Sequence, residues 1–140
     1  MNIRTPIELT QPDNELLTPL PIEALILFGS YAQNVASEWS DYDIAVLVKS
    51  NLSKQQRKQI YDKVYDLVSK KINRLVDIDI VFLPEAPMEL QNHVAKYGKV
   101  LYEQNAQVFP RFRESVMRNY ADFAPLRQIF QNATLARITP

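Results

Sequence analysis

The chain has 140 residues, 46% of them hydrophobic, so it is long enough for one domain with an apolar core and too apolar to be disordered throughout. Its 16 basic and 16 acidic side chains cancel, which excludes a general attraction to nucleic acid or to an anionic membrane, and we expect no direct nucleic-acid binding. It has no cysteine, no apolar run near the length of a membrane span and no signal-peptide core, so we expect no disulfide, no thiolate metal site and a soluble, cytoplasmic protein.

The first 20 residues carry Pro6, Pro12 and Pro19, which argue against a long helix. A short helix over residues 13–17 is compatible with this spacing. The apolar run that follows predicts a first strand over residues 21–28.

A Gly-Ser pair, Gly29-Ser30, ends this strand, and we expect a short helix over residues 31–36 to begin there. The polar segment 34–40 is predicted to be a loop that carries Trp39. A tryptophan on such a loop could stack on a base, although packing as a loop anchor is the more common role. The second strand is predicted over residues 44–48.

Residues 53–75 predict an amphipathic helix that lies on a sheet. Ser53 is the expected N-cap, and Gln56 stands three residues later in capping-box position. The apolar residues at helical spacing are Ile60, Val64, Leu67, Val68, Ile72 and Leu75.

The third predicted strand, residues 76–83, has carboxylates on one of its two faces. Asp77, Asp79 and Val81 share that face, because strand side chains alternate. Burying a charge in a core strand is costly unless a cation or hydrogen bonds compensate. If this strand lay beside other carboxylates, a cation bound between them would compensate for the buried charge.

A helix is predicted over residues 88–97, followed by a stop at Gly98 and a strand over residues 99–103. His93, the only histidine, has no pattern of partners, so it is interpreted as a structural or surface residue and not as a base. This interpretation also removes Ser-His and Cys-His hydrolases from consideration. The residues expected to form the buried stripe of the helix are Leu90, Val94 and Tyr97.

A second long helix is predicted from Pro110, and a shorter apolar stripe follows Pro125. Its aromatic and arginine residues fit a protein interface, and core packing is an equal alternative for Phe112 and Val116. We expect residues 1–104 to form the main domain and residues 105–140 to form a helical extension that packs on it or on a partner. The predicted fold class is α/β (α+β): a small mixed β-sheet with helices packed against it.

The ends of the first two strands carry a candidate nucleotide site. Gly29 lets a phosphate approach the backbone, and Ser30 adds a hydroxyl at a predicted helix start, where free amides favour anions. Asp41 and Asp43 point the same way, with Cα atoms roughly 6.6 Å apart, and could share hard cations. Each pattern alone is usually a turn or a solvated strand edge, but their combination beside two apolar strands favours a nucleotide site.

This Gly-Ser, ten-residue, Asp-x-Asp pattern resembles the DNA polymerase beta-like nucleotidyltransferase superfamily. Residues 27–32 and 40–47 are similar to those of the minimal nucleotidyltransferases, the MNT antitoxin group. The resemblance implies the polymerase beta-like fold, Mg²⁺ as cofactor and ATP as substrate. It further implies that Asp41, Asp43 and Asp79 are metal-binding and catalytic residues and that Gly29 and Ser30 bind the nucleotide, with Asp77 as the alternative third carboxylate.

Proteins of this group act as antitoxins, so the resemblance implies a HEPN-domain ribonuclease toxin as partner. It implies the transfer of AMP from ATP to a tyrosine of that toxin, which neutralises it. Two alternatives are an antitoxin that acts by binding alone and a small-molecule (antibiotic) nucleotidyltransferase. The sequence departs from the family at Gln33-Asn34, where Arg-Gly is common, and the loss of that arginine removes a cation near the phosphates.

Overall fold

The structure is a computed structural model, and it describes residues 7–37, 40–49, 51–72 and 76–122. Its four strands form one sheet in the order β3-β2-β1-β4, in which β2 and β3 are parallel and the other pairs are antiparallel. The expected mixed sheet with packed helices is therefore confirmed. The elements are α1 (Gln11–Leu17), β1 (Ile22–Phe28), β2 (Tyr42–Val48), α2 (Lys54–Ser69), β3 (Ile78–Phe82), the 3-10 helix η1 (Leu83–Glu85), α3 (Met88–Tyr97), β4 (Lys99–Glu103) and α4 (Val108–Asp122).

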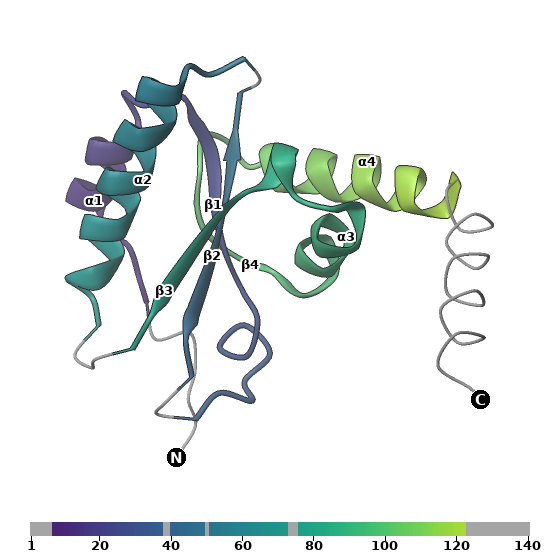
Figure 1. The fold of residues 1–140 in the computed structure, drawn as a ribbon, viewed down its shortest axis with the longest axis horizontal. Helices are drawn as coiled ribbons and strands as arrows, with labels where there is room; N and C mark the ends of the chain where they lie inside the picture. Colours follow the sequence, from purple (N-terminus) through teal and green to yellow (C-terminus); the bar gives the residue numbers. More distant parts are fainter. Residues whose placement is uncertain (1–6, 38–39, 50, 73–75, 123–140) are drawn as a thin grey trace, which may run out of the picture.

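Helices cover both faces of the sheet. Figure 1 shows α1 and α2 on one side of it and α3 and α4 on the other. The larger apolar core lies on the α1/α2 face, where alternate residues of β1 and β2 meet Val64 and Val68 of α2. The α3/α4 face has a smaller core made of Ala24, Ile26, Phe28, Ala45, Leu83 and Val94.

The predicted cap of α2 is present in the structure. The Gln56 amide donates to the Ser53 hydroxyl at 3.1 Å, and the Gln56 side chain accepts from the Ser53 amide at 2.9 Å. These two bonds satisfy donors that the first turn of a helix leaves free. Of the predicted apolar stripe, Ile60, Val64, Leu67 and Val68 are buried; Ile72 follows the helix, and Leu75 lies outside the described residues.

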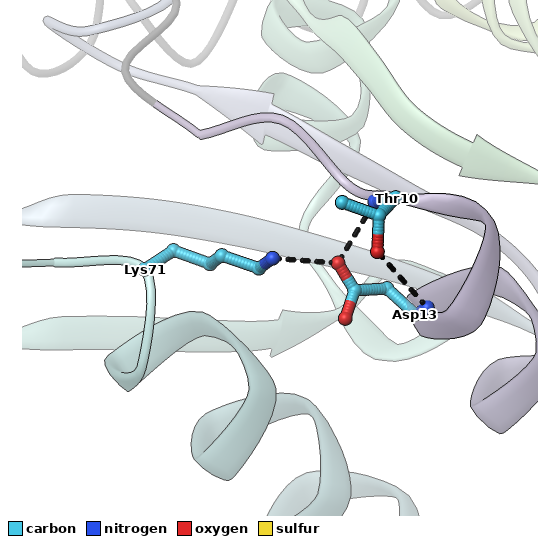
Figure 2. A network of polar contacts seen from close by, with 3 residues as sticks. All are labelled: Thr10, Asp13 and Lys71. Carbon is cyan, nitrogen blue, oxygen red and sulfur yellow. Dashed lines mark hydrogen bonds and ion pairs between the residues drawn. The ribbon is translucent and has the colours of Figure 1, made fainter.

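A polar network ties α1 to the end of α2 (Figure 2). The Asp13 carboxylate accepts from the Thr10 amide at 2.8 Å and lies 2.7 Å from the Lys71 ammonium. The bond from Lys71, followed by that from the Thr10 backbone, holds the pKa of Asp13 below its usual value. The short helix predicted here is confirmed, and it begins two residues before the predicted start.

The helix predicted over residues 31–36 was wrong. This segment is a turn in which the Gln33 amide donates to the Gly29 carbonyl at 3.2 Å. Asn34 then takes a left-handed conformation, with φ at 59°, which ends the helical turn before a helix can continue. Tyr31 also holds the segment by stacking on Tyr42, with ring centroids 4.0 Å apart.

The stripe predicted for α3 was wrong at Tyr97, which is 50% exposed. The helix and the following strand have the predicted bounds, and Val94 is fully buried against the sheet. A Cβ on Gly98 would lie 2.5 Å from a methyl of Ile26, so the chain is pressed onto β1 directly after the helix. The last turn of α3 consequently leaves Tyr97 at the surface.

The terminal helix α4 begins at Val108 and contacts α3, β1 and β4. Val116 is buried, and the Tyr120 hydroxyl bonds to the Glu89 carboxylate of α3 at 3.1 Å. Phe123 and the apolar stripe predicted after Pro125 lie outside the described residues. Among the described helices, none is long and apolar enough to cross a membrane.

Candidate active site

The turn after β1 brings Gly29 against Asp43. Since β1 and β2 are antiparallel with Phe28 opposite Asp43, the end of one strand meets the beginning of the other. Gly29 has φ at 78°, and a Cβ there would lie 2.2 Å from an Asp43 carboxylate oxygen. Glycine is thus required twice at this position, for its backbone conformation and for the space that the carboxylate occupies.

The parallel pairing of β2 and β3 places Asp79 directly beside Asp43. Neighbouring strands lie about 4.8 Å apart, so the two carboxylates share one end of the sheet. Asp41 comes just before β2, two residues from Asp43. Asp43 and Asp79 are on the same strand faces as Ala45 and Val81, which belong to the core beneath α3 and α4.

The three carboxylates interact electrostatically. Partial burial, together with the charges of Asp79 and Asp41, raises the pKa of Asp43 to about 6. Asp41 and Asp79 are exposed, whereas Asp43 is half-buried. Burial and the two neighbouring charges thus disfavour the ionised form of Asp43, which a bound cation would favour.

The donor set fits Mg²⁺ because all of its members are hard oxygen ligands. In the described part of the chain, however, no three histidine, aspartate or glutamate side chains stand in metal-binding geometry. Like charges repel each other, which disfavours the close approach of the three carboxylates without a cation. Asp41, Asp43 and Asp79 are therefore candidate ligands of a cation at this end of the sheet.

The alternative third carboxylate, Asp77, lies just outside β3. Its backbone carbonyl accepts a hydrogen bond from the Tyr42 amide at 3.0 Å, and its side chain is exposed. Asp79, not Asp77, is in register with Asp43, and the charges that raise the pKa of Asp43 are those of Asp79 and Asp41. The geometry thus favours Asp79 as the partner of Asp43.

Ser30 follows Gly29 and is half-buried, with its carbonyl accepting from the Val35 amide at 3.0 Å. Because no helix begins there, the argument from free amides at a helix start does not apply to this turn. Asn34 holds the left-handed conformation that glycine, common here in the family, adopts without strain. Gln33 is exposed, and Trp39 lies outside the described residues.

Two aromatic residues that were not predicted at the site, His93 and Tyr97, follow Phe28 in a row of ring contacts. The His93 ring stands edge-on to Phe28, with centroids 6.4 Å apart, and the Tyr97 ring is 5.2 Å from His93. The sequence contained one indirect indication of their position: the predicted helix that carries both residues is followed directly by a predicted strand. That strand, β4, turned out to pair with β1, and this pairing brings the helix to the site.

Residues 14–107 match the family described as polymerase beta, nucleotidyltransferase. The chain is 34% identical over 126 residues to the protein adenylyltransferase MntA of Aphanizomenon flos-aquae (strain 2012/KM1/D3), covering 82% of this chain and 80% of the relative.

Solved structures share the fold. A chain of a toxin-antitoxin structure with AMP-PNP has 26% identity and a TM-score of 0.69, covering 91% of this chain and 99% of the other. A chain from a complex of a tri-AMPylated Shewanella oneidensis HEPN toxin with MNT antitoxin has 24% identity and a TM-score of 0.61, covering 88% and 95%, which shows the fold alone. With the family match spanning most of the chain, this protein belongs to the polymerase beta nucleotidyltransferase family, as its Gly-Ser and Asp-x-Asp motifs predicted.

Proposed function

We propose that this protein is an antitoxin that transfers AMP from ATP to a tyrosine of a HEPN-domain toxin. The observation that carries the proposal is the position of Asp43, against the Gly29 backbone and in register with Asp79. The names of the relatives support it: one is a protein adenylyltransferase, and the structure of 26% identity is that of a toxin-antitoxin with AMP-PNP.

The roles follow from the chemistry of each group. The backbone at Gly29 and the Ser30 hydroxyl bind phosphate oxygens. Asp41, Asp43 and Asp79 would hold Mg²⁺, which when bound neutralises the triphosphate and makes the acceptor hydroxyl easier to deprotonate. Asp79 accepts the proton of the tyrosine hydroxyl while the tyrosine oxygen attacks the α-phosphorus of ATP. Pyrophosphate leaves from the opposite side.

We propose that the chain divides into a domain and an extension that packs on it. Residues 1–104 would form the minimal nucleotidyltransferase domain, and residues 105–140 the extension. The contact of α4 with α3 supports packing of the extension on the domain.

The test is to incubate the protein with ATP, Mg²⁺ and the toxin encoded beside it, and to record the intact mass of the purified toxin. We expect the toxin to gain whole AMP units on tyrosine and to stay inactive after this protein is removed. The double variant Asp41→Ala/Asp43→Ala is the matched control and should leave the mass unchanged.

A second candidate function is inhibition by binding alone, and the exposed Gln33, where arginine is common in the family, is the observation that favours it. In that case the toxin mass would stay unchanged while inhibition was complete, and inhibition would reverse when the proteins were separated. AMP transfer to an aminoglycoside or another small hydroxyl compound, with no change in the toxin, would identify the antibiotic-modifying alternative.

A further inference from the structure

An exposed aromatic side chain stands beside the candidate active site. Tyr97 is 50% exposed, although it occupies the last turn of a helix that packs on the sheet. Its ring lies 5.2 Å from that of His93, which in turn stands edge-on to Phe28 at 6.4 Å. Phe28 directly precedes Gly29, so a row of three rings runs from the active-site turn to the surface.

The sheet holds this row in place. Lys99, the first residue of β4, pairs with Leu27 near the end of β1. Gly98 is packed so closely against Ile26 that a Cβ would lie 2.5 Å from its methyl group. The end of α3 is therefore fixed next to the end of β1, on the face of the sheet that also carries Asp43 and Asp79.

We infer that Tyr97 stacks on the base of the bound nucleotide and that His93 positions its ring. The inference rests on the proposed function, because it requires the phosphates of a nucleotide at the Gly29 turn. Phe28, which precedes this turn, shares a core cluster with Val94 of α3, so α3 is a neighbour of a nucleotide held there. An aromatic ring that is half in water gains stability when a base covers it, and stacking of this kind tolerates different bases because each has a π-face.

The experiment separates the contribution of the base from that of the phosphates. Binding of Mg-ATP and of Mg-tripolyphosphate, which has the same phosphates and no base, is measured by calorimetry in the absence of toxin. We expect Tyr97→Ala to weaken ATP binding roughly ten-fold or more, the range of a lost base–aromatic stack, and to leave tripolyphosphate binding unchanged. Tyr97→Phe should retain ATP binding, because it keeps the ring.

Tyr65→Ala is the matched control, since Tyr65 is 43% exposed and lies on α2, across the sheet; it should bind both ligands as the wild type does. His93→Ala should raise KM for ATP with little change in kcat. His93→Phe should return KM for ATP to the wild-type value, as expected of a positioning residue.

Three results would overturn the inference alone: no effect of Tyr97→Ala, an equal loss of both ligands, or a base-dependent loss in Trp39→Ala with none in Tyr97→Ala. The second result would mark Tyr97 as structural, and the third would move the stack to Trp39. A wild-type protein that bound neither ligand would overturn the proposed function and the inference with it.

Discussion

The two faces of the sheet differ in how far their apolar cores extend. On the α1/α2 face the core is continuous, whereas on the α3/α4 face it is smaller and ends in carboxylates. Ile44 and Asp43 are neighbours on β2 and show the contrast: Ile44 is fully buried on one face, and Asp43 is half-buried beside two like charges on the other. Alternation along a single strand thus lets one residue stabilise the fold while the next faces the candidate active site.

Replacing Ile44 should have the largest effect, and on stability. Ile44→Ala leaves a cavity in the larger core and should lower the free energy of unfolding by about 2–5 kcal/mol, whereas Ile44→Val should cost about 0.5–1.5 kcal/mol. Urea unfolding followed by circular dichroism measures both. The contrast between the faces would break down if Ile44→Ala abolished AMP transfer with no loss of stability.

Replacing Asp43 should have the opposite signature. Asp43→Ala removes a metal ligand and should slow transfer about a hundred-fold or more, roughly 2.7 kcal/mol of barrier. The free energy of unfolding should hold or rise, because the variant relieves repulsion among carboxylates. Asp41→Ala should also abolish transfer. Turnover that persisted in the double variant would remove both residues from the site.

Two variants of the third strand test which of its carboxylates belongs to the candidate site on the α3/α4 face. Asp79→Asn should stop transfer, since Asp79 is the carboxylate in register with Asp43. Asp77→Asn should only weaken it, because Asp77 lies outside the strand and contributes its backbone to the sheet. Initial rates with ATP, Mg²⁺ and the toxin compare the two variants. The reverse ranking would make Asp77 the third carboxylate.

The raised pKa of Asp43 predicts how stability depends on pH without divalent ions. Between the ordinary value of 3.8 and about 6 the folded protein binds more protons than the unfolded chain. The contribution of protonated Asp43 to the free energy of unfolding is therefore fully present below pH 3.8. It is lost as the pH rises through about 6. Urea midpoints measured across this range in wild type and in Asp43→Asn should differ in slope, and parallel curves would argue against the raised pKa.

The smallest effect concerns the turn itself. Asn34 is left-handed, so Asn34→Ala should lower stability by about 1 kcal/mol, whereas Asn34→Gly should be nearly neutral. Thermal unfolding compares the two variants. Equal losses in both would mean that the Asn34 side chain, and not its backbone conformation, stabilises the turn.

Local signals in the sequence were sufficient for much of the fold. The bounds of α3 and β4 and the capping box of α2 were predicted correctly, because periodicity and caps depend on neighbouring residues. The Gly-Ser and Asp-x-Asp motifs identified the family for the same reason: each lies within a few residues of the chain. The prediction of a helix after Gly29 was wrong because Asn34 adopts a left-handed conformation there, while Tyr31 stacks on Tyr42, a tertiary contact that local signals do not reveal.

The sequence by itself determined where along the chain the strands lie and which strand faces are polar, and it predicted Gly29 and Asp43 as site residues. Tertiary structure alone decided the order β3-β2-β1-β4, and with it the placement of Asp79 rather than Asp77 beside Asp43. It also decided that Tyr97 stands at the surface, with its ring 5.2 Å from that of His93. The physical reason is range: propensity and alternation act between near neighbours, whereas strand order and register depend on packing between segments far apart in the chain.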